Sequence, residues 1–155
     1  MKEINIIAKI SVCSYEELNE VEKNLVEAAK AASLNAYAPY SKFQVGAAVL
    51  LDSGQVITAN NQENAAYPSG LCAERTVLFY SGAQFPENAV NALAVAGFTN
   101  GHFTSSCITP CGACRQVISE VEKRFGQSIS ILLYGEKEIY KIHGVKDILP
   151  LPFEG

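Results

Sequence analysis

The sequence has no apolar run long enough to cross a membrane and no block of basic residues. Its longest apolar stretches, such as residues 45–51 and 91–98, fall far short of the roughly 20 residues that a membrane-spanning helix needs. The N-terminus also lacks the layout of a secretory signal. Twelve basic against sixteen acidic residues give a formal charge of −4, which disfavours a nucleic-acid partner. We therefore expect a soluble, cytoplasmic protein that binds neither membrane nor nucleic acid.

The sequence has five cysteines, an odd number that cannot pair completely in disulfides. The chain contains no repeat or low-complexity segment. In a chain with an intracellular character, such cysteines favour metal binding or catalysis over a disulfide scaffold. The length of 155 residues and the hydrophobic content of 48% suit one ordinary domain with a single core. We expect one domain over residues 1–155.

The hydrophobic pattern predicts strands interleaved with helices. Strands are expected at residues 4–12, 43–51, 55–60, 91–98, 129–134 and 138–142, and helices at 15–35, 72–80 and 110–125. Ser14 and Glu17 form a possible capping box for the first helix, and Gly54 permits a tight turn between the second and third strands. The polar stretch 60–70 is long enough to be a working loop. This order is typical of an α/β fold, in which helices cover the faces of a sheet.

Two short motifs carry the metal chemistry: "CAERT" at Cys72 to Thr76 and "PCGACRQ" at Pro110 to Gln116. The spacing of Cys111 and Cys114 is the usual half-site for tetrahedral zinc, and Cys72 supplies a third thiol. Because Cys72 and Cys111 both fall at expected helix N-termini, the partial positive charge there stabilises their thiolates. The motifs favour a catalytic zinc site with three protein ligands.

Two other interpretations of the cysteines stay open. The close pair could be a redox dithiol, although a redox pair needs no third thiol. A closed structural site with Cys107 as fourth ligand also has acceptable spacing. Against it, Cys107 can point into the core as a small hydrophobe, and a structural site has no use for Glu74.

Glu74 follows Cys72 by two residues on the same helical turn. From there a carboxylate can reach an open coordination position, so we interpret Glu74 as the acid–base group and not as a ligand. Arg75 has two interpretations: a plain surface cation, or a donor to the thiolates that restores the electrophilic character of zinc.

The sequence resembles the small homotetrameric, zinc-dependent cytidine deaminases, because Cys72-Ala73-Glu74 with Pro110-Cys-x-x-Cys matches the zinc-deaminase signature. The likeness extends over "AYAPYSKFQVGAAVL", "NQENAAYPSGLCAERT", "LAVAG", "PCGACRQVISE" and "ILPLPF". It implies a three-layer α/β sandwich with a mixed sheet of about five strands between helices. The expected strand near the N-terminus is an addition to that pattern.

The resemblance implies zinc-dependent hydrolytic deamination of cytidine and deoxycytidine to uridine and deoxyuridine, with release of ammonia, as in pyrimidine salvage. Zinc-bound hydroxide would be the nucleophile and Glu74 the proton shuttle. Cys72, Cys111 and Cys114 would hold the Zn²⁺ cofactor, and Arg75 would support the thiolates.

The resemblance also assigns the substrate contacts. Phe43 would line the pyrimidine pocket, Asn61 and Glu63 would bind a ribose hydroxyl, and the backbone at Ala73 would hold the edge of the base. By themselves, Phe43 reads as a core strand residue, and Asn61 and Glu63 as polar groups that cap a loop.

Neighbouring subunits of a homotetramer would complete the pocket. By position these contributions come from Ala65, Tyr67 and Phe153, with Tyr40 at the same subunit junction. The alternatives are a deaminase of a cytosine-containing antibiotic such as blasticidin S, a polynucleotide-editing deaminase, and a non-enzymatic zinc module. Phe43, Asn61 and Glu63 together favour the simple nucleoside.

Overall fold

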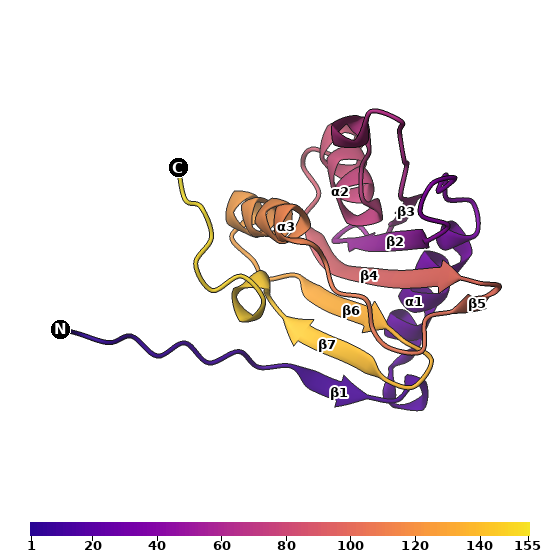
Figure 1. The fold of residues 1–155 in the computed structure, drawn as a ribbon. Coiled ribbons are helices and arrows are strands. Elements are labelled where there is room, and N and C mark those ends of the chain that lie inside the picture. Colours follow the sequence, from indigo (N-terminus) through magenta and orange to yellow (C-terminus); the bar gives the residue numbers. More distant parts are fainter.

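Seven strands form one mixed sheet in the computed structural model, which describes residues 1–155 (Figure 1). The strands are β1 (Ser11–Cys13), β2 (Gln44–Leu51), β3 (Val56–Asn60), β4 (Val90–Thr99), β5 (His102–Phe103), β6 (Ser130–Tyr134) and β7 (Ile139–His143). Their order is β1-β7-β6-β4-β2-β3, and β5 pairs with β4. Only the β4–β6 pair is parallel. The predicted mixed sheet is confirmed, with seven strands and not about five, because the short β1 and β5 add to its margins.

Helices cover both faces of the sheet (Figure 1). The helix α1 (Glu20–Ser33) packs on one face, and α2 (Ala73–Gln84) and α3 (Gly112–Phe125) pack on the other. Along β4, alternate residues serve the two sides: Leu93 and Val95 belong to the core under α2 and α3, while Ala94 belongs to the core under α1. The predicted three-layer α/β sandwich is confirmed. No helix has both the length and the apolar character needed to cross a bilayer.

Small residues let α1 lie very close to the sheet. Gly46, Ala48, Ala94 and Ala96 form the buried floor beneath it. A Cβ atom built on Gly46 would lie 2.0 Å from the carbonyl oxygen of Ala29 in α1, so no larger residue fits without moving the helix.

The first helix begins later than expected. The Asn19 side chain accepts from the Glu22 N–H at 2.9 Å, and the Glu22 carboxylate accepts from the Asn19 N–H at 3.1 Å. This reciprocal cap starts α1 at Glu20. Upstream, the Ser14 N–H donates to the Glu17 carboxylate at 2.7 Å, but those residues form only a single 3₁₀ turn. The capping box predicted at Ser14 therefore opens a turn and not the main helix.

The expected N-terminal strand is present but short. Residues 4–12 are rich in Ile and Val, which suggested a longer strand, yet only β1 pairs, with β7. The partner strand β7 ends at His143, so it offers no pairing residue to residues 1–8. These residues run away from the sheet beyond β1 (Figure 1).

Two crossover helices set the position of the functional site. β3 and β4 both lie antiparallel to β2 and so run in the same direction, and α2 connects them. The chain then crosses through α3 from β4 to the parallel strand β6. The helix α2 follows β3 and α3 follows β4, and these two strands run in the same direction. Because both helices also pack on the same face, both begin at the same end of the sheet. The residues just before α2 and α3 are Cys72 and Cys111.

Candidate metal centre

Three thiols meet where α2 and α3 begin. Cys72 is the N-cap residue of α2, Cys111 is the N-cap residue of α3, and Cys114 lies in the first turn of α3. The Sγ atoms of Cys72 and Cys111 are 3.9 Å apart, those of Cys111 and Cys114 are 3.4 Å apart, and all three lie within 4.8 Å of one another. No side chain caps either helix, so the positive ends of both helices face the sulfurs.

The spacing and chemistry of these thiols fit a zinc ion. Zinc–sulfur bonds of about 2.3 Å in a tetrahedron place neighbouring sulfurs about 3.8 Å apart. The observed 3.9 Å between Cys72 and Cys111 agrees with that geometry. Soft thiolates also select zinc over hard cations such as magnesium. Because only three ligands converge, a bound ion would keep one position open to a reactant.

Cys107 lies outside this cluster. Its thiol donates to the carbonyl of Glu138 at 3.2 Å, and its side chain packs against the core under α2 and α3. Burial raises the pKa of the Cys107 thiol, which stays protonated and donates its hydrogen to Glu138. The geometry therefore lends no support to a closed four-cysteine site.

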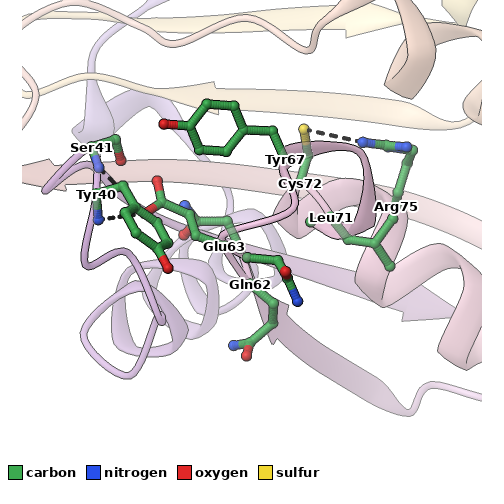
Figure 2. A pocket seen from close by; sticks show the side chains of 11 residues that line it. Tyr40, Ser41, Gln62, Glu63, Tyr67, Leu71, Cys72 and Arg75 are labelled. Atoms are coloured by element: carbon green, nitrogen blue, oxygen red, sulfur yellow. Dashed lines mark hydrogen bonds between the residues drawn. The ribbon is translucent and has the colours of Figure 1, made fainter.

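Neighbouring groups stabilise negative charge on Cys72. A hydrogen bond from the Cys114 thiol, followed by one from Arg75, lowers the pKa of Cys72 to about 5. Nη2 of Arg75 lies 3.7 Å from the Cys72 sulfur (Figure 2). The same thiol–thiol hydrogen bond, together with burial, raises the pKa of Cys114. A thiolate is thus favoured at Cys72, at the edge of the cluster that faces Arg75.

Glu74 is buried directly behind the thiols, with 5% of its surface exposed. Burial raises the pKa of its carboxyl group, and negative charge on Cys72 adds to the effect. A carboxyl group with a raised pKa holds a proton near neutral pH more readily than an ordinary glutamate does. This property suits a group that takes up and returns protons. Ala73, one residue earlier, is completely buried at the start of α2.

A cavity of about 530 Å³ opens beside Cys72 (Figure 2). Its walls come from the loop before β2 and from the segment between β3 and α2: Tyr40, Ser41, Asn61, Gln62, Glu63, Asn64, Tyr67, Gly70, Leu71, Cys72 and Arg75. The volume lies within the range of about 300–1,000 Å³ that is usual for small-molecule sites. The cavity therefore connects the thiol cluster to the polar loop 60–70.

Backbone bridges hold that polar loop in place. Gln62 and Leu71 exchange two backbone hydrogen bonds of 3.0 Å, and Gln62 also bridges to Tyr37. The two ends of the loop are therefore close together, and the chain enters α2 beside the cavity. The stretch predicted to be a working loop forms one wall of the cavity.

Glu63 is fixed by the chain that precedes β2. Its carboxylate accepts from the N–H groups of Tyr40 at 2.8 Å and Ser41 at 3.3 Å (Figure 2). The Ser41 side chain lowers the pKa of Glu63, so the carboxylate is charged in the cavity wall. A fixed, charged carboxylate is a strong acceptor for a ligand hydroxyl.

Asn61 joins the cavity wall to the start of β2. Its side-chain oxygen accepts from the N–H of Val45 at 2.8 Å, and its amide nitrogen donates to the carbonyl of Phe43 at 3.0 Å. One amide hydrogen and one lone pair remain for a ligand. The half-buried Phe43 is held by this contact but is not among the residues that line the cavity of the single chain.

Three predicted contacts lie at the outer surface. The Tyr67 ring packs edge-on against Tyr40, with centroids 6.2 Å apart, and remains largely exposed. Ala65 is exposed on the loop, outside the cavity lining. Phe153 is 79% exposed, while its backbone exchanges two hydrogen bonds of 2.9 Å with the Gln116 side chain of α3. The chain does not bring Ala65 or Phe153 into its own cavity.

Sequence reasoning assigned no role to Arg115 or Gln116, although both stand in the second motif. Nε of Arg115 donates to the carbonyl of Pro110 at 2.8 Å, and Nη1 donates to that of Ile148 at 2.7 Å. Arg115 thereby holds the approach to Cys111, and Gln116 holds the C-terminal tail. Their place directly after Cys114 was the signal that could have identified them.

Comparisons with known proteins agree on one family. Residues 19–126 match the model of the cytidine and deoxycytidylate deaminase zinc-binding region. A cytidine deaminase of Sporosarcina psychrophila is 46% identical over 101 residues, which cover 65% of this chain and 69% of that protein. A cytidine deaminase of Mycobacterium tuberculosis is 42% identical over 102 residues, which cover 65% of this chain and 72% of the relative.

Solved structures show the same likeness over more of the chain. The crystal structure of cytidine deaminase from Burkholderia pseudomallei matches with a TM-score of 0.70 and 41% identity, covering 84% of this chain and 97% of that one. The cytidine deaminase from Mycobacterium tuberculosis matches with a TM-score of 0.67 and 33% identity, covering 86% and 98%. With the thiol cluster, the buried glutamate and the shared fold, these matches show that the chain belongs to the cytidine and deoxycytidylate deaminase family.

Proposed function

We propose that the chain is a zinc-dependent cytidine deaminase, which hydrolyses cytidine and deoxycytidine to uridine and deoxyuridine and releases ammonia. The observation that carries the proposal is the buried Glu74 behind three converging thiols, next to a cavity of nucleoside size. The similar proteins of Sporosarcina psychrophila and Burkholderia pseudomallei are named cytidine deaminases.

The thiols of Cys72, Cys111 and Cys114 would hold the zinc ion. When bound, zinc supplies Lewis acidity, which makes a water molecule acidic enough to serve as nucleophile near neutral pH. Arg75 donates to the sulfur of Cys72 and so withdraws charge from the ligand set, which keeps the site electrophilic.

Glu74 moves the protons of the reaction. Its carboxylate takes a proton from the attacking water and gives it to ring N3 while the oxygen bonds to C4. It then transfers the second proton of that water to the amino group, the C4–N bond breaks, and ammonia leaves. One water molecule is consumed for each ammonia released. The burial of Glu74, which raises its pKa, supports this double role.

Residues around the cavity would position the nucleoside. Asn61 and Glu63 line the cavity with an amide and a fixed carboxylate, both suited to a sugar hydroxyl. Phe43, held by Asn61, would pack on the pyrimidine ring. The backbone at Ala73, at the start of α2, would hold the polar edge of the base.

Neighbouring subunits would complete the pocket in a homotetramer. The exposed Ala65 and Phe153 support this assignment because they lie outside the cavity of their own chain, and Tyr67 supports it because its ring lines the cavity yet remains largely exposed. Light scattering on active enzyme should give the mass of four chains or of a multiple of four. An active monomer would contradict the shared pocket. We place the reaction in pyrimidine salvage in the cytoplasm, where thiol ligands stay reduced.

The decisive test is Glu74→Gln in zinc-loaded protein, assayed by ultraviolet absorbance with cytidine and deoxycytidine. We expect the wild type to turn both over, and the variant to keep its zinc and lose at least about 100-fold in kcat, the usual contribution of a general acid–base group. The exposed Glu87 supplies the matched control, because Glu87→Gln makes the same change away from the site. A zinc-loaded wild type that leaves both nucleosides unchanged would refute the proposal, and turnover of blasticidin S alone would reassign the substrate.

A further inference from the structure

The N-terminal segment, residues 2–10, is an unpaired continuation of the sheet edge. It extends from β1, which is the last strand on its side of the sheet (Figure 1). Its only hydrogen bond runs from the N–H of Lys9 to the carboxylate of Asp147 at 3.1 Å. Ile4 and Ile7 are 81% and 79% exposed. Residues 1–13 contain no proline or bulge, two of the features by which proteins block an open edge. Charged side chains also block an edge, and this segment carries Lys2, Glu3 and Lys9.

The direction of the Lys9 hydrogen bond orients the whole segment. In extended chain, consecutive residues turn their N–H and C=O groups to alternate sides. Since Lys9 turns its N–H toward the body of the protein, odd-numbered residues face inward and even-numbered residues face the free edge. Side chains alternate in the same way between two faces. The side chains of Ile4, Ile6 and Ala8 therefore lie on one face of the segment, and the N–H and C=O groups of these residues point to the free edge.

We propose that two copies of the chain associate by antiparallel pairing of their N-terminal segments, with Ile6 opposite Ile6 of the second copy. In this register Ile4 lies opposite Ala8, and Glu3 lies opposite Lys9. The Ile4–Ala8 pair thus joins a large apolar side chain to a small one, and the Glu3–Lys9 pair joins an acidic side chain to a basic one. The remaining pairs set Lys2 opposite Ile10 and Asn5 opposite Ile7. Two Glu3–Lys9 pairs form, one on each side of the two-fold axis.

Other registers satisfy fewer of these conditions. In the proposed register the numbers of two paired residues always add up to 12. If they added up to 11 or 13, a residue whose backbone groups face outward would lie opposite one whose groups face inward, and the hydrogen bonds would be lost. If they added up to 14 or 10, Glu3 would lie opposite Ser11 or Ile7, and no ion pair would form. The self-complementary charge pattern is the reason to name a second copy as the partner.

The contact leaves the proposed catalytic site free. The cavity lies beside the loop that follows β3, and β3 and β1 are the two opposite edges of the sheet. Association through the N-terminal segment is thus separate from the contacts of Tyr67 and Phe153 in the shared pocket, and its loss should leave the environment of Glu74 unchanged.

Charge reversal tests both the contact and its register in the full chain. We expect Glu3→Lys and Lys9→Glu each to lower the mass of the assembly, measured by analytical ultracentrifugation, to half or less at a concentration where the wild type is fully associated. The double variant with both changes should restore the wild-type mass. Lys2→Glu is the matched control, because Lys2 faces Ile10 in this register and no like charge arises.

Two outcomes would overturn the proposal. One is an unchanged mass in both single variants and in a chain that begins at Ile10. The other is a loss of mass in the single variants that the double variant does not restore, since this would exclude the Glu3–Lys9 register. All point changes lie on exposed side chains, so none of them threatens the fold.

Discussion

Cys107 and Cys114 are both half-buried or buried thiols near α3, but only Cys114 shares the cluster with Cys72 and Cys111. We expect Cys107→Ser to keep one zinc per chain, because Cys107 donates only to a backbone carbonyl. Cys114→Ser should lose zinc, since it removes one of three converging ligands. Metal analysis after gel filtration checks both, and zinc loss from the Cys107 variant would revive the closed structural site.

The pair Cys111 and Cys114 could be predicted from spacing, because ligand distance along a helix start is a local property. Cys72, 39 positions earlier, was predicted from the motif that it forms with Glu74. The partners of Asn61 and Arg115 could not be, because they depend on backbone groups brought near by the fold. Asn61 contacts Val45 and Phe43, sixteen and eighteen residues away, and Arg115 contacts Ile148. Spacing along the chain carries no record of such contacts.

At the scale of elements, the close packing of α1 on β2 depends on the missing side chain at Gly46. We expect Gly46→Ala to reduce the free energy of unfolding by about 3 kcal/mol, the upper range for overpacking, because a Cβ would lie 2.0 Å from the Ala29 carbonyl and 2.4 Å from the Ser33 nitrogen. Urea unfolding measures the change.

Gly82 in α2 is the control for this substitution. A Cβ there meets only the end of the Arg124 side chain at 3.6 Å, an ordinary contact. Gly82→Ala should therefore stabilise the protein by up to about 1 kcal/mol through helix propensity. A Gly46→Ala variant as stable as the wild type would show that α1 can move without cost.

Element boundaries were predictable where local signals decide them. Gly126 ends α3 in the left-handed conformation, and Gly54 turns the β2–β3 hairpin, as the sequence indicated. The start of α1 was missed because the sequence holds two adjacent capping boxes, and the one at Asn19, not the one at Ser14, begins the helix. The two-residue strand β5 exists only through its pairing with β4.

For the whole molecule, we propose that residues 1–155 form a single domain that unfolds in one step. Both cores pack on the same strands, since β4 and β6 contribute residues to each. Tyrosine fluorescence and circular dichroism should give coincident urea transitions; the chain has no tryptophan. Two separated transitions would contradict a single domain.

The pairing of Cys72 with Cys111 has a consequence for the unfolded chain. The two residues are 39 positions apart, and α2 and β4 lie between them. A metal ion held by both residues would act as a removable cross-link between the starts of α2 and α3. Because the ligands converge only in the folded chain, the binding energy of the ion would stabilise the native state alone. Chelation should therefore shift the urea midpoint downward as well as stop turnover, so availability of the ion would govern how long the enzyme survives in addition to how fast it works.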